Sequence, residues 1–374
     1  AAAELKAKHG ADNVFDFSLG NPDVPAPAEV GEALRELADH ASEPKIFGYV
    51  PNAGLPSLRA KLAERVAREQ AVPVDSSQII VTCGAAGAIN ALFRAILEPG
   101  DEVLCPAPYF VEYGFYAGNY KGVLKTVPTT ESFDPDLERM AEAITDRTRA
   151  VLINSPNNPT GRVYSATVMA GLADLLRRKS AEFGRPILLV SDEPYRFLVY
   201  DGVDVPPVLS QYDASIVISS FSKSLSLAGA RIGYMAVHPT MPDLEKLLAG
   251  VTMTNRVLGY VNAPIIAQRL LEHVLDSGVD TSIYDERRHA MAELLDSAGL
   301  DYVMPQGAFY FFPKCPEGRD DKEFARKLLD QNVIAVPGSG FGRANHLRLT
   351  YCVDSAIIRG ARDNVLRAVE TTPN

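Results

Sequence analysis

Ser215-Ile216-Val217-Ile218, followed by Ser219-Ser220-Phe221-Ser222-Lys223-Ser224, joins a short apolar run to a loop of small hydroxyl residues around one lysine. A run of this kind is typical of a strand buried on both faces of a parallel sheet. Ligands of open parallel sheets bind beyond the carboxyl ends of the strands. We therefore expect Lys223 at the mouth of a cleft, although most lysines are ordinary solvated surface residues. A buried lysine can lose its proton and attack an aldehyde.

Similar short apolar runs alternate with longer helical stretches on both sides of this segment. The further predicted strands are Gln78–Thr82, Glu102–Cys105, Val123–Val127, Ala150–Ile153 and Ile187–Val190. One helix is predicted to follow the strand at Gln78–Thr82 and to end near Leu97, and another is predicted to cover about Ser165 to Phe183. This alternation predicts an α/β fold with a mostly parallel sheet and helices on both faces.

The pattern changes toward the end of the chain. Predicted helices cover Leu244–Ser277, Ile283–Ala298 and Ser355–Val369, and predicted strands cover Ala308–Phe312, Val333–Val336 and His346–Tyr351. We interpret this part as a smaller α+β domain that the N-terminal segment joins. The predicted division is a large domain at 44–250 and a small domain at 1–43 and 251–374.

Composition excludes several classes of function. The chain has 374 residues, enough for about two domains, and a formal net charge of −10, which disfavours a nucleic-acid partner. No apolar run reaches the length of a membrane span, and residues 1–9 contain no apolar block typical of a secretion signal. The four cysteines form no CxxC pair and the six histidines form no HExxH motif, so no metal site is expected. A cytoplasmic location is the default expectation.

Three further polar loops follow predicted strands. Thr82–Gly87 is rich in small residues and opens a helix, where free N–H groups and the helix dipole favour a phosphate. Asn154–Gly161 contains three asparagines, and Ser191–Tyr195 carries two carboxylates. Each loop alone could be a tight turn or a helix cap. Four such loops at four strand ends, with Arg231 behind the last one, instead predict a ligand site at one edge of the sheet.

These motifs resemble those of the class I and II aminotransferases, which depend on pyridoxal 5′-phosphate (PLP). The resemblance rests on Ser220-Phe221-Ser222-Lys223 with Arg231-Ile232-Gly233, on Asn158-Pro159-Thr160-Gly161, and on Asp192-Glu193-Pro194-Tyr195. It extends from Leu19-Gly20-Asn21-Pro22 to Arg348, which is nearly the whole chain. It implies PLP fold type I, with a large and a small domain. The implied activity is the transfer of an amino group between an L-amino acid and a 2-oxo acid, with the aspartate/2-oxoglutarate type as one candidate.

The resemblance also implies a role for each matching residue. Lys223 would bind the cofactor aldehyde and later act as a base, and Asp192 would bind the pyridine nitrogen. The other implied cofactor contacts are Asn158 and Tyr195 at the phenolic oxygen, Ser220, Arg231, Ala85 and Ala86 at the phosphate, and Phe110 stacked on the ring. Arg348 would hold the substrate α-carboxylate, beside Gly20 and Asn158. Tyr49 would reach the phosphate of a neighbouring subunit, which implies a homodimer.

Substrate choice stays open at this point. In well-known aspartate aminotransferases a partner-subunit arginine binds the side-chain carboxylate, but no arginine stands at the corresponding 250–252 here. Arg256, Arg162 and Arg343 are the remaining candidates. Two other functions share most of these residues: a carbon–sulfur β-lyase of the same fold, and a non-catalytic PLP-binding effector module. The second normally accompanies a basic DNA-binding domain, which this acidic chain does not show.

Overall fold

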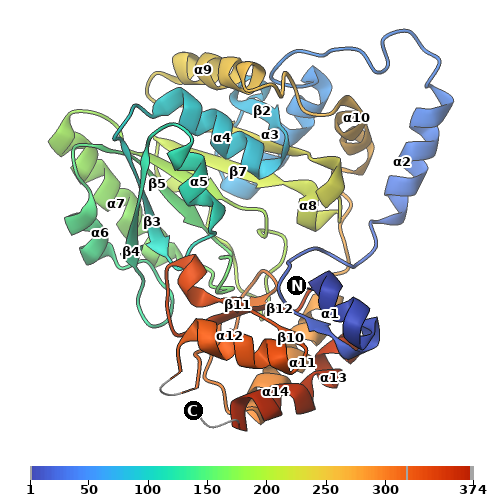
Figure 1. Cartoon of the computed structure of the whole chain (residues 1–374). Coiled ribbons are helices and arrows are strands. Elements are labelled where there is room, and N and C mark those ends of the chain that lie inside the picture. The colour runs from blue at the N-terminus through green and yellow to red at the C-terminus, as the bar shows by residue number, and fades with distance from the viewer. Residues whose placement is uncertain (1, 317–318, 371–374) are drawn as a thin grey trace.

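The computed structural model describes residues 2–316 and 319–370 (Figure 1). The largest sheet in this part of the chain has seven strands in the order β2-β8-β7-β6-β5-β3-β4. Their bounds are β2 Ile79–Thr82, β3 Glu102–Ala107, β4 Val123–Pro128, β5 Thr148–Asn154, β6 Leu188–Asp192, β7 Ser215–Ser220 and β8 Gly233–Val237. Neighbours from β4 to β7 pair in parallel, whereas β8 pairs antiparallel with both β7 and β2. The predicted mostly parallel α/β sheet is confirmed, and β8 is a strand that the sequence pattern does not predict.

Helices surround this sheet (Figure 1). They are α2 Ala28–Asp39, α3 Pro56–Gln70, α4 Gly84–Ile96, α5 Glu112–Gly118, α6 Leu137–Ala143, α7 Ala166–Phe183, α8 Phe221–Ser224, α9 Leu244–Val257 and α10 Ile265–Val274. α4 packs on β7 and β8, and α9 lies along α4. Local sequence sets the ends of α7: the Ser165 side chain accepts from the Val168 amide, and Gly184 ends the helix at φ +66°.

A second group of elements forms the lower part of the molecule in Figure 1. It contains a sheet in the order β11-β12-β9 and a parallel pair, β1 with β10. Their bounds are β1 Phe15–Asp16, β9 Tyr310–Phe311, β10 Val333–Ile334, β11 Val336–Pro337 and β12 Leu347–Thr350. The helices here are α1 Ala2–His9, α11 Ser282–Ser297, α12 Asp321–Asp330, α13 Ser355–Gly360 and α14 Arg362–Glu370. Short 3-10 helices lie at Ala11–Asn13, Ser76–Gln78, Leu209–Gln211, Ala228–Ala230 and Gly338–Phe341.

Two predicted elements of this region are divided in the structure. The helical stretch 244–277 is interrupted between α9 and α10, where Gly259 has φ +94° and Pro264 immediately precedes α10. The predicted strand 333–336 becomes two strands in different sheets, because β10 pairs with β1 and β11 pairs with β12. The apolar pattern is continuous in both stretches, but Gly259 and Pro264 interrupt the helix and long-range pairing divides the strand.

The buried side chains form two main hydrophobic cores. The first core holds the seven-stranded sheet and also Val30 of α2 and Leu271 of α10. The second core holds Phe17 and most buried residues from Val279 to Ala368. The division of the chain into domains stays a proposal. These cores favour placing α2, α9 and α10 with the large domain, because α2 packs on α10, which in turn packs on α3. No helix in residues 2–316 and 319–370 is long and apolar enough to cross a membrane.

Candidate active site

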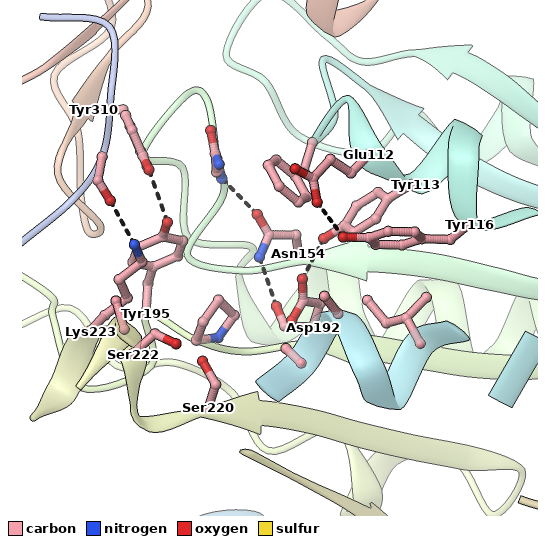
Figure 2. Close-up of a pocket in the computed structure, with 18 of the residues that line it drawn as sticks. Glu112, Tyr113, Tyr116, Asn154, Asp192, Tyr195, Ser220, Ser222, Lys223 and Tyr310 are labelled. Atoms are coloured by element: carbon pink, nitrogen blue, oxygen red, sulfur yellow. Dashed lines mark hydrogen bonds between the residues drawn. The ribbon is translucent and has the colours of Figure 1, made fainter. Parts of the chain in front are cut away.

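A cavity of about 310 Å³ lies beyond the carboxyl ends of β5, β6 and β7. Its lining contains the following predicted site residues: Gly20, Ala85, Ala86, Phe110, Asn158, Asp192, Tyr195, Ser220, Lys223, Arg231 and Arg348. Figure 2 shows Lys223 and Tyr195 on one side of this cavity and Tyr113 and Tyr116 on the other, with Asp192 between them. Residues from four strand-end loops and from the second core therefore meet at one place.

Lys223 sits in α8, the short helix that begins directly after β7. Its Nζ donates a hydrogen bond to the Gly20 carbonyl at 2.6 Å and lies 5.6 Å from the centre of the Phe309 ring. Burial lowers the pKa of the lysine amine, because the charged form loses its hydration. The amine is thus placed inside the cavity with a reduced tendency to hold a proton.

Asp192 ends β6, and its carboxylate is almost fully buried. Oδ2 accepts a hydrogen bond from the Tyr113 hydroxyl at 2.6 Å, whereas Oδ1 has no hydrogen-bond partner in the described part of the chain. Burial raises the pKa of Asp192 to about 7, the hydrogen bond from Tyr113 opposes this rise, and nearby Glu193 adds to it. Asn154 fixes the backbone by donating to the Asp192 carbonyl at 2.7 Å. One carboxylate oxygen is therefore free to accept a hydrogen bond from a ligand.

Arg348 lies in β12 and carries the third cation of the cavity lining, with Lys223 and Arg231. One amino group of its guanidinium donates to Asn158 Oδ1 at 3.1 Å and the other donates to the Ser18 carbonyl. The group lies between the Tyr310 and Phe341 rings, 4.8 and 4.7 Å from their centres. A planar fork held in this way suits a carboxylate.

The other end of the cavity has the properties of an anion site. Ala85 and Ala86 lie in the first turn of α4, where backbone N–H groups are unpaired and the helix dipole is positive. Arg231 adopts φ +52° and reaches this turn: a Cβ on Gly84 would lie 3.0 Å from its guanidinium. Ser220 lines the same cavity. Phe110 packs edge-on against Tyr113, with ring centres 5.5 Å apart.

Several residues of this site carry no signal that sequence analysis could use. Tyr113 stands three residues after Phe110, one helical turn away, but nothing local indicates that its hydroxyl meets Asp192. Tyr310 belongs to β9 in the other core, and its hydroxyl lies 3.0 Å from the Tyr195 hydroxyl. Asn154 belongs to the predicted polar loop 154–161, but nothing in the sequence indicates that its amide binds the Asp192 carbonyl.

The remaining candidates lie away from the cavity. Arg162 forms a two-bond salt bridge with Asp134 at 2.9 and 2.6 Å, and Arg343 pairs with Glu131 at 2.8 Å. Arg256 is exposed on α9. The Tyr49 side chain is 92% exposed, so its predicted contact with a neighbouring subunit stays a prediction.

Comparison with known proteins gives one consistent result. Residues 12–364 match the family described as aminotransferase class I and II. The probable aspartate/prephenate aminotransferase of Thermus aquaticus is 35% identical over 99% of this chain and 94% of its own length. A probable aspartate aminotransferase of Methanocaldococcus jannaschii is 33% identical over 90% of this chain and 88% of its own.

Solved structures agree with the sequence comparison. The crystal structure of an aminotransferase from Eubacterium rectale has a TM-score of 0.96 at 38% identity and covers 100% of this chain and 94% of its own. Aspartate aminotransferase of Thermus thermophilus with maleate has a TM-score of 0.88 at 33% identity, covering 98% and 94%. The resemblance inferred from the strand-end motifs is confirmed, and the chain belongs to the class I and II aminotransferase family.

Proposed function

We propose that this aminotransferase binds PLP in the cavity, joined to Lys223, and moves an amino group between an L-amino acid and a 2-oxo acid. The family implies PLP dependence. One observation carries the proposal: a partly buried lysine amine, a buried carboxylate with one free oxygen, and a buried guanidinium line a single cavity. Each of these groups suits a different part of the chemistry.

The residues present fit the cofactor. Asp192 Oδ1 is buried and unpartnered among the described residues, as expected of an acceptor for a protonated ring nitrogen. The first turn of α4 and Arg231 form a positive site for the phosphate, and Ser220 adds a hydroxyl. Asn158 and Tyr195 line the cavity where they can donate to the phenolic oxygen.

Bound PLP would supply an electron sink for negative charge at the substrate α-carbon. Lys223 would take a proton from that carbon, and burial assists because it favours the neutral amine. Before it can do so, Nζ must give up its hydrogen bond to the Gly20 carbonyl. Positioned proton transfer of this kind is worth about 10²–10⁴ in rate.

Arg348 would orient the substrate. Its guanidinium would hold the α-carboxylate, and Asn158 and the flanking aromatic rings restrict its rotation. Holding the substrate at two points fixes the direction of the breaking C–H bond, and orientation can supply up to ~7–11 kcal/mol in the best cases.

The names of the relatives favour aspartate as the first donor to test and favour transamination over β-elimination. Arg162 and Arg343 are held in salt bridges with Asp134 and Glu131, which disfavours either of them as the group that binds a substrate side-chain carboxylate. Arg256 therefore stays the candidate for a second carboxylate, acting from a partner subunit.

We further propose a homodimer in which Tyr49 of each subunit completes the phosphate site of the other. The exposure of Tyr49, together with exposed Met253 and Val257 on α9, supports an unfilled interface on the single chain. Sedimentation would give the mass. Tyr49→Phe should weaken PLP binding without dissociating the dimer, and a monomer at micromolar concentration would contradict the proposal. The cytoplasmic location stays a prediction.

A direct experiment tests the main proposal. Purified protein is mixed with PLP, its visible absorbance is recorded, and borohydride reduction followed by peptide mass spectrometry locates the modified residue. A panel of amino acids with 2-oxoglutarate then reports new amino acids, and a cysteine conjugate without an acceptor reports release of pyruvate and ammonia. Failure to modify Lys223 would overturn the proposal, and pyruvate release without transamination would favour the β-lyase.

A further inference from the structure

Two buried phenols meet between the proposed phenolic-oxygen site and the carboxylate site. The hydroxyls of Tyr195 and Tyr310 are 3.0 Å apart, and their rings are nearly perpendicular at 86°. Both side chains are almost completely buried. Tyr195 follows β6 in the large sheet, whereas Tyr310 belongs to β9 in the other core. Figure 2 shows this pair at the side of the cavity that holds Lys223.

Tyr310 contacts two other parts of the site besides Tyr195. The Arg348 guanidinium lies over its ring at 4.8 Å. Its hydroxyl also lies against the N-terminal strap, the loop 17–27 between β1 and α2, because a Cβ on Gly20 would fall 2.0 Å from it. The same glycine accepts the Lys223 hydrogen bond at 2.6 Å. One hydroxyl thus stands where the carboxylate site, the strap and Tyr195 meet.

The direction of the hydrogen bond follows from counting protons. A phenol has one proton to donate, and neither hydroxyl has another hydrogen-bond partner in the described chain. If Tyr195 gives its proton to a ligand oxygen, it can only accept from Tyr310. A donor that itself accepts a hydrogen bond is polarised and donates more strongly. Tyr310 would therefore strengthen Tyr195 as a donor.

We propose that Tyr310 is a positioning residue that transmits the charge at Arg348 to the donor strength of Tyr195. This rests on the proposed function. The Arg348 cation favours ionisation of the Tyr310 hydroxyl and so makes it a better donor. A substrate carboxylate that neutralises Arg348 would weaken Tyr310, then Tyr195, and with it the hydrogen bond to the phenolic oxygen. Binding of substrate would thereby make the nitrogen that joins Lys223 to the cofactor hold its proton more tightly.

Burial, nearby charges and the hydrogen bond between the two hydroxyls all act on the ionisation of these phenols. Burial raises the pKa of Tyr310, while the nearby Arg348 cation and the hydrogen bond with Tyr195 lower it. Burial also raises the pKa of Tyr195, followed by the influence of Tyr310, while Arg348 lowers it and Asp192 raises it. Cys352 also raises the pKa of Tyr310. Among these groups Arg348 is the one cation facing both phenols.

The test is a pH titration of the PLP absorbance band, which reads a protonation equilibrium rather than activity. Tyr310→Phe should raise the titration midpoint by about 0.4–1 pH unit, the equivalent of one neutral hydrogen bond. Tyr310→3-fluorotyrosine, whose hydroxyl is more acidic, should lower it. Tyr302→Phe is the matched control: it loses a phenolic bond to Asp296 in the same core and should leave the midpoint unchanged.

A double-mutant cycle tests the link to Arg348. Arg348→Gln should raise the midpoint in the wild type and raise it less in the Tyr310→Phe background. Equal rises in both backgrounds, or a Tyr310→Phe midpoint identical to the wild type, would overturn the inference. Protein that shows no PLP band, or that reduction does not modify at Lys223, would instead refute the proposed function. The fluorinated variant keeps the ring and the hydroxyl, so its result decides the case even if Tyr310→Phe folds poorly.

Discussion

Removing the Tyr113 hydroxyl should change the ionisation of Asp192 in the cofactor-free protein. The Tyr113 hydroxyl donates to Asp192 Oδ2 at 2.6 Å, and it is the hydrogen-bond donor to this carboxylate among the described residues. Hydrogen bonds to charged groups contribute about 1.5–3 kcal/mol. One pKa unit corresponds to about 1.4 kcal/mol, so Tyr113→Phe should raise the pKa of Asp192 by roughly one to two units, from about 7.

The assay is NMR titration of protein labelled with ¹³C at the aspartate side-chain carboxyl. Comparison with Asp192→Asn identifies the Asp192 signal, which should titrate near neutral pH in the wild type and clearly above it in Tyr113→Phe. Tyr116→Phe is the control, because it removes a hydroxyl from the same helix that donates to Glu112 instead. If both tyrosine variants shift the signal equally, or if neither does, the hydrogen bond from Tyr113 does not control this carboxylate.

Four further outcomes are expected. Asp192→Asn should stabilise the cofactor-free protein relative to wild type, by up to ~4 kcal/mol as the pH rises from 4 to 8. The reason is that folded Asp192 keeps its proton to about pH 7, whereas the unfolded chain releases it near 3.8. If the urea midpoints of variant and wild type changed in parallel across this pH range, the prediction would be contradicted. Lys223→Ala should lose covalent retention of PLP and lower kcat by more than ~10⁴, read by reduction and stopped-flow spectra. Arg348→Lys should raise KM about 10–100-fold with a smaller change in kcat, since the planar guanidinium that pairs with the substrate α-carboxylate is lost. An unchanged KM for every donor would show that this carboxylate binds elsewhere. Gly20→Ala should lower stability by about 1–3 kcal/mol, because the added methyl would lie 2.0 Å from the Tyr310 hydroxyl, and an unchanged melting temperature would show that the strap adapts.

The sequence pattern predicted the core of the large sheet well, because strands buried on both faces read as continuous apolar runs. The runs at 150–153 and 215–218 lie within strands of the central sheet, and the run at 187–190 begins one residue before β6. The sequence pattern did not predict β8, since the place of this strand depends on antiparallel pairing with β7 and β2. The predicted helix 244–277 is too long for a different reason: the apolar periodicity continues where Gly259 and Pro264 interrupt the helix.

The chain by itself determined which residues stand at strand ends, and with them the lysine, the carboxylate and the family. Local patterns suffice for this, because each motif lies within a few residues of the strand that positions it. Tertiary structure alone decided the pairs that give the site its electrostatics. Tyr195 meets Tyr310 across 115 residues, Lys223 meets Gly20 across 203, and Arg348 meets Ser18 across 330. Such contacts depend on how two hydrophobic cores pack together, and no short-range periodicity in the sequence records that packing.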